Sequence, residues 1–331
     1  MSEQACPNPF GGFRFGAEEL QEPATPAWIC QGLLAAGHIT LLTSQWKSGK
    51  TTLLSLLLGC RRAGSQLAGF GVKEGKTMVI SEDDISLWAP RHRKLNFGDN
   101  TGIYSRPFGS MNRDEAWPKI MDMIETEHAI HGFDLVVIDS LAYFLPGHAE
   151  NNASLLLQAL APLERFTRRG IAVLLIHHPS KGETIVGQAA RGSGALASLV
   201  DIILEMDFFR RRDLTDRRRT FHLLSRLDDS PGQFVLELNK EGTAYTNLGS
   251  SLALDFEESW DVVAGILGGS AQPLSRRHIL DLWPNPDLAP NPGTLCRFLN
   301  RAVEQKLLIQ IGRGTKNDPF RFRLPAKETA A

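Results

Sequence analysis

A short polar turn between an apolar run and a helical segment constrains the fold of this 331-residue chain more than any other feature. The turn, Ser44–Thr51 (SQWKSGKT), follows the apolar run 38–43 and precedes a helical pattern over 51–62. Where a glycine-containing turn opens a helix, its backbone N–H groups point inward and bind phosphate oxygens. The order of strand, turn and helix therefore predicts a phosphate-binding loop (P-loop) on an α/β scaffold.

Each position of this turn has a role in that prediction. Lys50 is expected to neutralise the β- and γ-phosphates of ATP, and the Thr51 hydroxyl to bind Mg²⁺. Gly49 leaves room for the phosphate chain because it has no Cβ. Ser44 stands where such loops usually begin with glycine, and serine is small enough for the loop to form. The residues predicted to contact the nucleotide are Ser44, Gln45, Trp46, Lys47, Ser48, Gly49, Lys50, Thr51 and Thr52.

Four short apolar runs predict a mainly parallel central sheet that is buried on both faces. They cover residues 38–43, 76–81, 134–139 and 171–176. Helical patterns between them, clearest over 51–62 and 117–131, indicate an α/β core flanked by helices. Further runs with short connections predict added, partly antiparallel strands. These runs are 200–206, 219–225 and 233–238.

Acidic residues follow two of the predicted buried strands. Asp139 ends the run LVVID and can hold Mg²⁺ through water beside a P-loop. Glu82 ends the run before it and can polarise an attacking water as general base. Asp83 and Asp84 are rivals for that role, and either could instead cap a helix.

Two adjacent histidines, His177 and His178, end the fourth apolar run. A polar side chain at this point can contact the γ-phosphate and sense its loss. Zinc binding by the pair is disfavoured, since neighbouring residues on a strand point to opposite faces. The alternative is that both histidines only form hydrogen bonds at the strand end.

Taken in this order, the P-loop, the apolar runs and the polar residues at their ends resemble the RecA-type ATPase core, and in particular the branch of the hexameric plasmid replicative helicase RepA. The resemblance runs from Pro26 to Gly249. It rests on the P-loop together with the motifs SEDD (81–84), LVVIDSL (135–141), LLIHHPSKG (174–182), ARGSGALASLVDIILEM (190–206) and LLSRLDD (223–229).

The resemblance implies an ATPase whose sites lie between subunits. It makes Lys50 and Thr51 the nucleotide and Mg²⁺ ligands, Asp139 the metal-supporting carboxylate and Glu82 the catalytic carboxylate. The resemblance also makes His178 the polar residue that senses the γ-phosphate. Arg226, in LLSRLDD, resembles an arginine finger inserted into the neighbouring subunit's site, which implies a ring-shaped homo-oligomer. The plainer interpretation of Arg226 is a surface arginine on an edge strand.

The segment 179–194 has no apolar periodicity and contains four glycines. RecA-type motors place their inner DNA-binding loop directly after the sensor strand, so the resemblance implies that Lys181 and Arg191 contact single-stranded DNA in a central channel. An ordinary surface loop is the alternative.

The C-terminal unit resembles a winged helix, a helix-turn-helix variant. Three helices are predicted over 260–267, 275–283 and 294–306, followed by strands over 308–311 and 320–324. The third helix has a buried apolar stripe and opens with Asn291-Pro292, a cap followed by proline. Its exposed side and the basic hairpin predict contacts with duplex DNA. The predicted DNA-binding residues are Arg297, Arg301, Arg313, Lys316, Arg321 and Arg323.

Basic charge is concentrated locally, although the formal net charge is only −1. Residues 288–327 carry eight Lys/Arg and two Asp/Glu, and 210–219 (RRRDLTDRRR) carries six arginines. Such clusters are typical of a nucleic-acid interface. The second cluster could equally contact a subunit or form a solvated hairpin, and a winged helix can also bind protein.

The expected domains are an irregular arm (1–25), an ATPase domain (26–250), a winged helix (255–325) and a flexible tail (326–331). No apolar run is long enough to span a membrane, and the N-terminus has no leader pattern, so the cytoplasm is expected. We expect a DNA motor or helicase of plasmid or mobile-element replication. An ATP-switched initiator, loader or regulator and a KaiC-like signalling ATPase are the alternatives, and nothing in the sequence separates the motor from the switch.

Overall fold

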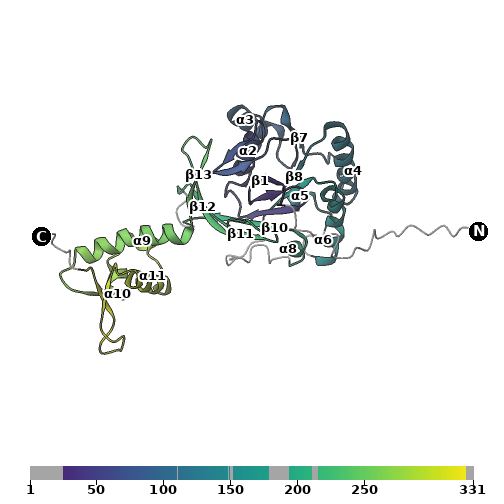
Figure 1. The fold of residues 1–331 in the computed structure, drawn as a ribbon. Helices are drawn as coiled ribbons and strands as arrows, with labels where there is room; N and C mark the ends of the chain where they lie inside the picture. The colour runs from purple at the N-terminus through teal and green to yellow at the C-terminus, as the bar shows by residue number, and fades with distance from the viewer. Residues whose placement is uncertain are drawn as a thin grey trace, which may run out of the picture.

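The computed structural model describes residues 25–109, 111–147, 149, 152–178, 194–210 and 215–325. Nearly all of the predicted arm (1–25), the predicted tail (326–331), Lys181 and Arg191 lie outside these residues. An α/β part runs as far as strand β13, and helix α9 then leads into a small C-terminal part (Figure 1). None of the described helices is long and apolar enough to cross a lipid bilayer.

Among the described residues, a nine-stranded sheet forms the centre of the α/β part, in the order β13-β12-β11-β10-β3-β9-β8-β6-β7. The strands that pair in parallel are β3 (Ile39–Ser44), β6 (Thr77–Ser81), β7 (Thr101–Ser105), β8 (Leu135–Asp139), β9 (Ala172–His177) and β10 (Ile202–Phe208). An antiparallel extension consists of β11 (Arg218–Ser225), β12 (Gln233–Leu238) and β13 (Tyr245–Gly249). The predicted mainly parallel sheet is confirmed.

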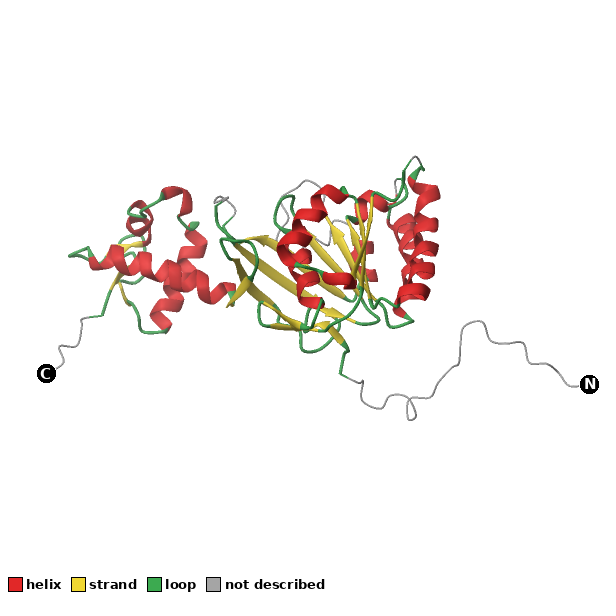
Figure 2. Cartoon of the chain, turned by 90° about the horizontal axis from the view of Figure 1, so that it is seen from above, coloured by secondary structure: helices red, strands yellow, loops and turns green. Residues whose placement is uncertain are grey.

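Helices cover both faces of this sheet (Figure 2). The longer ones are α2 (Lys50–Arg61), α3 (Ile85–Leu95), α4 (Arg113–His131) and α6 (Ala153–Leu160), and the shorter ones are α5 (Leu141–Phe144), α7 (Glu164–Thr167) and α8 (Gly194–Leu199). Strand β8 shows how the layers form, since Val137 packs with α2 while Val136 and Ile138 pack with α4. Successive residues of the strand thus point into two separate cores, one on each face of the sheet. Because the neighbouring strands are parallel, their carboxyl ends lie at the same edge.

Several elements of the α/β part were not predicted. A small antiparallel sheet, in the order β2-β1-β5-β4, consists of β1 (Trp28–Cys30), β2 (Leu34–Ala35), β4 (Ser65–Leu67) and β5 (Phe70–Val72). These strands have two or three residues each, too few to show a period. Strand β7 alternates half-buried and exposed residues at the sheet edge, and α3 contains Pro90, which obscured its helical pattern.

The C-terminal part has a core of its own, which includes Val263, Ile279, Leu299 and Phe322. Its elements are α9 (Ser251–Gly268), β14 (Leu274–Ser275), α10 (Arg276–Asp281), α11 (Pro292–Glu304), β15 (Ile309–Ile311) and β16 (Arg321–Arg323). The three strands pair in the order β14-β16-β15. The Asn291 side chain accepts a hydrogen bond from the Thr294 N–H and caps α11, as the sequence predicts.

Helix α9 begins earlier than predicted. Its first residue is Ser251, whereas the apolar pattern placed the start at Trp260. The added turns pack against β12 and β13, and the Gln233 amide donates a hydrogen bond to the buried Ser251 hydroxyl. One continuous helix therefore connects the sheet extension to the C-terminal part, and residue 255 lies inside it.

Candidate nucleotide-binding site

The predicted P-loop joins the end of β3 to the start of α2. Gly49 is the N-cap residue of α2, and its φ of 107° lies in a region that favours glycine. The Leu53 N–H donates to the Gly49 carbonyl at 2.9 Å, so the helix begins immediately after the turn. The first N–H groups of α2 therefore open onto the loop, where an anion can accept from them.

Lys50 extends back across this loop. It is only 4% exposed, and its ammonium group donates to the backbone carbonyls of Ser44 at 2.9 Å and Gln45 at 2.8 Å. Burial lowers the pKa of Lys50 to about 8, although Asp139 and Glu82 oppose the shift. A buried cation whose hydrogen bonds go to neutral carbonyls gains strongly from a multivalent anion, because a charged hydrogen-bond partner offsets its desolvation.

Buried hydroxyl groups surround the loop. Within the described residues, the side-chain oxygens of Thr43, Ser44 and Ser48 are buried without a hydrogen-bond partner. Unsatisfied buried polar atoms are rare in folded proteins and mark places where a ligand or an ion completes the bonding. Trp46 differs from these buried hydroxyl groups, because it is 71% exposed although it belongs to the same loop.

Glu82 and Asp139 come together at the edge where their strands end. Their strands are adjacent, with Ser81 opposite Asp139, and the Glu82 N–H donates to the Asp139 carbonyl at 2.8 Å. The Ser140 hydroxyl donates to a Glu82 carboxylate oxygen at 2.9 Å. Burial raises the pKa of Glu82, and burial together with Asp83 and Glu82 raises the pKa of Asp139 to about 7. A cation placed here would stabilise both charged carboxylates.

Asp83 and Asp84 have other partners. A carboxylate oxygen of Asp83 accepts from Arg91 at 2.9 Å, whereas Asp84 caps α3 by accepting from the Ser86 N–H. Glu82, by contrast, interacts electrostatically with Lys50. This arrangement favours Glu82 over its two neighbours as the group that acts on a bound nucleotide, and that role stays a prediction.

The two histidines lie at the end of β9, beside the P-loop strand. Residue 177 is opposite Thr43 of β3, and the His178 ring makes an edge contact with Trp46 at 6.1 Å between centroids. Burial, Lys50 and His177 lower the pKa of His178 to about 4, so the ring is neutral at pH 7. A neutral ring next to Lys50 suits the predicted sensor, because it can donate a hydrogen bond without adding charge.

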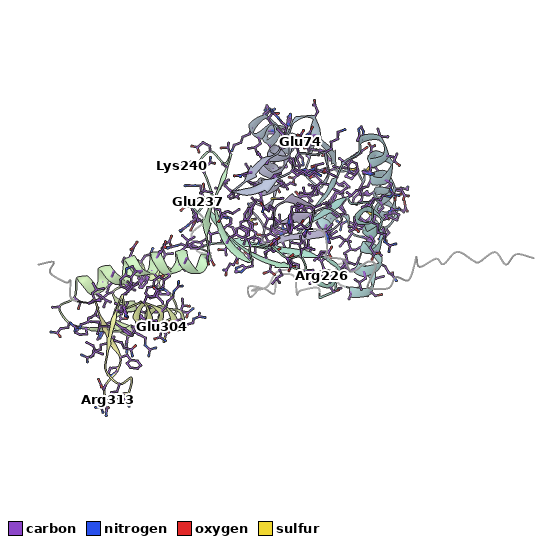
Figure 3. All side chains as sticks on the ribbon, in the orientation of Figure 1. Glu74, Arg226, Glu237, Lys240, Glu304 and Arg313 are labelled. Atoms are coloured by element: carbon purple, nitrogen blue, oxygen red, sulfur yellow. The ribbon has the colours of Figure 1, made fainter. Side chains whose placement is uncertain are left out.

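Arg226 lies far from the P-loop of its own chain. It follows β11, whose last residue is opposite Ile202 at the start of β10, and β10 runs parallel to β3. Arg226 is therefore at the amino edge of the parallel strands, and Figure 3 shows it on the lower side of the sheet. Its guanidinium donates to the Ser198 carbonyl at 2.7 Å, and its side chain is 60% exposed.

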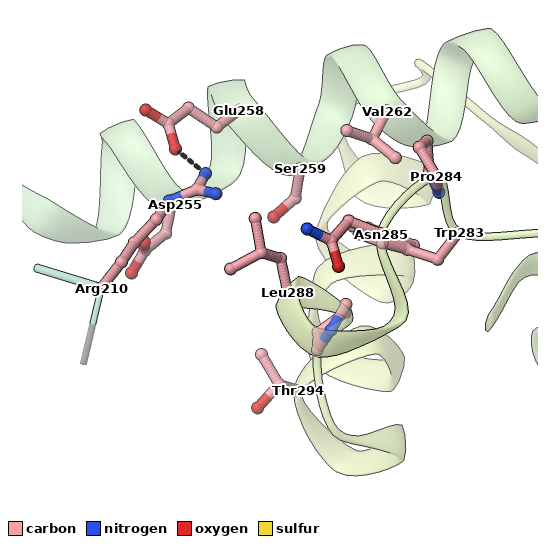
Figure 4. A pocket seen from close by; sticks show the side chains of 11 residues that line it. Arg210, Asp255, Glu258, Ser259, Val262, Trp283, Pro284, Asn285, Leu288 and Thr294 are labelled. Carbon is pink, nitrogen blue, oxygen red and sulfur yellow. Dashed lines mark hydrogen bonds and ion pairs between the residues drawn. The ribbon is translucent and has the colours of Figure 1, made fainter. Parts of the chain in front are cut away.

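The arginine-rich segment 210–219 folds back onto the chain, which the sequence did not indicate. Arg218 forms a two-pronged pair with Asp216 and a further ion pair with Glu258 of α9. Arg210 also pairs with Glu258 (Figure 4). Glu258 thus lies between two guanidinium groups and fastens α9 to the turn end of the β10–β11 hairpin.

The other two described arginines of this segment bind elsewhere. Arg217 pairs with Glu237 at 3.5 Å, and the Arg219 Nε donates to the Ser48 carbonyl of the P-loop at 2.7 Å. The four described arginines therefore all have partners within the chain, and Arg217 keeps 41% of its side chain exposed. Residues 211–214 lie outside the described part. These contacts could not be predicted from the sequence because most of the partners are far away along the chain. Only Asp216 lies close in sequence to the arginine that it binds.

The predicted DNA-binding residues of the C-terminal part are all exposed: Arg297, Arg301, Arg313, Lys316, Arg321 and Arg323. Figure 3 shows Arg313 at the tip of the hairpin between β15 and β16. The guanidinium of Arg301 lies 4.5 Å from the ring centre of Phe256. Two of the predicted contacts, Lys181 and Arg191, fall outside the described residues.

A cavity of about 450 Å³ lies between α9 and the α10–α11 connection (Figure 4). Its lining combines basic, acidic, polar and apolar side chains: Arg210, Asp255, Glu258, Ser259, Val262, Trp283, Pro284, Asn285, Leu288, Pro290 and Thr294. Burial raises the pKa of Asp255. The predicted nucleotide-binding and catalytic residues are absent from this lining, so the cavity is separate from the P-loop site.

A family model described as an AAA domain matches residues 9–184. The match contains the P-loop, Glu82, Asp139 and both histidines. The chain belongs to this AAA-type P-loop ATPase family. Members hydrolyse nucleotide, and the family implies the use of ATP and usually Mg²⁺. The match covers the core as far as β9 and leaves out β10–β13, and the specific likeness to the RepA branch stays a prediction. A comparison with curated proteins gave no match.

Proposed function

We propose that this AAA-type ATPase is a ring-forming DNA motor, a helicase or translocase of plasmid or mobile-element replication. Its C-terminal part is proposed to be a winged helix that binds duplex DNA. The observation that carries the proposal is the convergence of Lys50, Glu82 and Asp139 at one edge of the sheet, at the start of α2. These groups suit the hydrolysis of ATP, and a motor needs that reaction as its source of energy.

In the proposed site, Lys50 leaves its contacts with the loop carbonyls and binds the terminal phosphates. Glu82, positioned by the Ser140 hydroxyl, accepts the proton of the attacking water. His178 donates a hydrogen bond to the γ-phosphate. The loop N–H groups orient the triphosphate without a large rearrangement, because α2 already begins at Lys50.

The residues present fit a Mg²⁺ ion. Thr51 offers a hydroxyl in the first turn of α2, and Asp139 is a buried carboxylate whose pKa is raised by burial and then by the negative charges of Asp83 and Glu82. Hard oxygen donors of this kind are the ligands that Mg²⁺ prefers. When bound, the ion would neutralise charge on the phosphates and shield the repulsion between Glu82 and Asp139.

Arg226 supports a site shared between subunits. Because it lies at the opposite edge of the sheet from its own P-loop, it can reach a nucleotide only in a neighbouring copy. Its exposed guanidinium is then the proposed arginine finger, and the ring follows from each subunit completing the next one's site.

DNA binding has separate support from the C-terminal part. Two helices, α10 and α11, and the hairpin β15–β16 follow α9 in the order expected of a winged helix. Exposed arginines on α11 and on the hairpin are proposed to contact DNA phosphates. Lys181 and Arg191, in the segment after the sensor strand, are proposed to contact single-stranded DNA in the channel.

The test is ATP turnover measured with and without single-stranded DNA over a range of protein concentrations. A motor with shared sites predicts a specific rate that rises with protein concentration and rises further with DNA. Arg226→Ala should abolish turnover and leave ATP affinity nearly unchanged. Duplex binding with slow, DNA-independent turnover would instead identify a switch, and indifference to all nucleic acid would exclude both DNA functions.

A further inference from the structure

We propose that Arg219 is a positioning residue of the nucleotide site, which holds the Ser48 carbonyl and thereby turns the Gly49 N–H toward the phosphates. Arg219 comes from β11, in the antiparallel extension that the family model does not cover. The inference rests on the proposed binding of ATP by the P-loop.

The guanidinium of Arg219 is fixed on several sides. Its Nε donates to the Ser48 carbonyl at 2.7 Å, and one Nη donates to the carbonyls of Asp216 and Arg218, each at 2.7 Å. Its central carbon lies 4.4 Å from the ring centre of Phe208 on β10. Arginine holds such a geometry well because its donors form a rigid planar fork.

The contact determines the direction of one peptide group. In a trans peptide, the carbonyl of one residue and the N–H of the next point in opposite directions. Since the Ser48 carbonyl points to Arg219, the Gly49 N–H points away from that guanidinium. An inward-facing nest of N–H groups needs this orientation in order to bind phosphate.

Without such a contact, the Ser48–Gly49 peptide could rotate at little cost. Gly49 has a φ of 107° and no Cβ, so its backbone tolerates other orientations. The hydroxyl of Tyr245 on β13 lies beside Gly49, where a Cβ would meet it at 3.6 Å. The extension thus contacts the loop at two successive residues, Ser48 and Gly49.

Arg219 differs from its basic neighbours in the kind of partner that it binds. Arg210, Arg217 and Arg218 all pair with carboxylates, whereas the hydrogen bonds of Arg219 within the described residues go to backbone carbonyls. The charges of Asp216 and Asp207 also act on Arg219, but its hydrogen bonds hold backbone carbonyls, including that of Ser48 in the P-loop.

The experiment compares MgATP binding by wild type, Arg219→Gln, Arg219→Lys and the control Arg217→Gln, using isothermal titration calorimetry and full-length protein. Removing a charge-assisted hydrogen bond should weaken MgATP binding of Arg219→Gln by about 10- to 100-fold. In steady-state turnover, KM should rise by a similar factor while kcat at saturation falls by less than about threefold. Arg217→Gln should bind like wild type.

Arg219→Lys separates positioning from simple charge. Lysine keeps the positive charge but cannot form the fork, so its affinity should be reduced at both low and high salt. Affinity equal to wild type for Arg219→Lys, or for a folded Arg219→Gln, would overturn the inference. If Arg219→Gln does not fold, Arg219→Lys alone decides. Failure of the wild type to bind MgATP would overturn the proposed function instead.

Discussion

Two arginine-rich regions of this chain look alike in sequence and differ in structure. In the segment 210–219, the described arginines bind carboxylates and carbonyls of their own chain. In the C-terminal part, Arg297, Arg313, Arg321 and Arg323 are exposed, and none of the described carboxylates forms an ion pair with them. We call the charge of the first region internal, because it is paired within the chain, and the charge of the second region outward, because it is exposed to solvent.

The difference comes from the acidic residues that the fold brings near. Asp216 is two residues from Arg218, but Glu237 and Glu258 reach the segment only through β12 and α9. Charge density along the sequence therefore does not show which cations are available to a partner. Changes to internal charge should alter stability or catalysis, whereas changes to outward charge should alter binding with a strong dependence on salt.

The largest effect is expected from the internal charge at the P-loop. Lys50→Ala should abolish ATP turnover, because the ammonium group is proposed both to bind the terminal phosphates and to stabilise charge in the transition state. Steady-state ATPase assays measure the loss. Duplex affinity of the C-terminal part should stay unchanged, and a parallel loss of DNA binding would contradict the separation of the two regions.

The next effect concerns the carboxylates after β6. Glu82→Gln should lower turnover by about 10²- to 10⁴-fold while MgATP still binds, because the general base is lost. Asp84→Asn is the matched control, since Asp84 caps α3 and should affect stability more than rate. A greater loss of turnover in the Asp84 variant would reverse the assignment.

Glu258 tests the internal pairing itself. Glu258→Ala leaves Arg210 and Arg218 without the carboxylate between them, and the free energy of unfolding should fall by about 1–2 kcal/mol, between the values for exposed and buried pairs. Urea unfolding measures the change. The control is Glu304→Ala, an exposed carboxylate at the end of α11. Equal stability of the two variants would mean that Glu258 does not fasten α9.

The predicted DNA-binding residues of α11 are tested by alanine at both Arg297, whose charge points outward, and Arg301, which also lies over Phe256. Duplex affinity should fall, and the slope of log affinity against log salt should become shallower by up to about 1.8 if both residues contact phosphate. Fluorescence anisotropy over a salt series measures both quantities. Unchanged affinity and slope would show that α11 does not bind DNA.

The smallest effect is a dependence of stability on pH at His178. Its pKa is lowered to about 4, so between pH 6.5 and 4 the unfolded chain binds a proton that the folded chain does not. The contribution of the neutral ring to stability is complete above pH 6.5 and decreases as the pH falls toward 4. Wild type should therefore lose more stability than His178→Gln between pH 7 and pH 5 in urea unfolding. Equal losses would contradict burial of a neutral ring.

Local patterns were enough to predict where most residues of the candidate nucleotide site lie in the fold. Four of the parallel strands are nearly continuous apolar runs in the sequence, and they lead to the P-loop, Glu82, Asp139 and His177. Because parallel strands end at one edge of the sheet, these residues converge. The P-loop itself is a contiguous motif of eight residues, and it is recognisable although Ser44 stands where such loops usually have glycine.

Other features depend on contacts that no local pattern records. Arg219 and Ser48 are 171 positions apart, and Arg218 and Glu258 are 40 apart. The early start of α9 likewise depends on packing against β12 and β13. Single-sequence reasoning could suggest that the arginines were functional, but it could not show that the fold pairs them internally.

Equilibrium dialysis of well-folded protein against labelled ATP and Mg²⁺ tests the central claim most directly. Wild type should retain nucleotide in proportion to protein, and Lys50→Ala should retain far less under the same conditions. Absence of retention by wild type, or equal retention by the two proteins, would contradict the claim that Ser44–Thr51 binds a triphosphate.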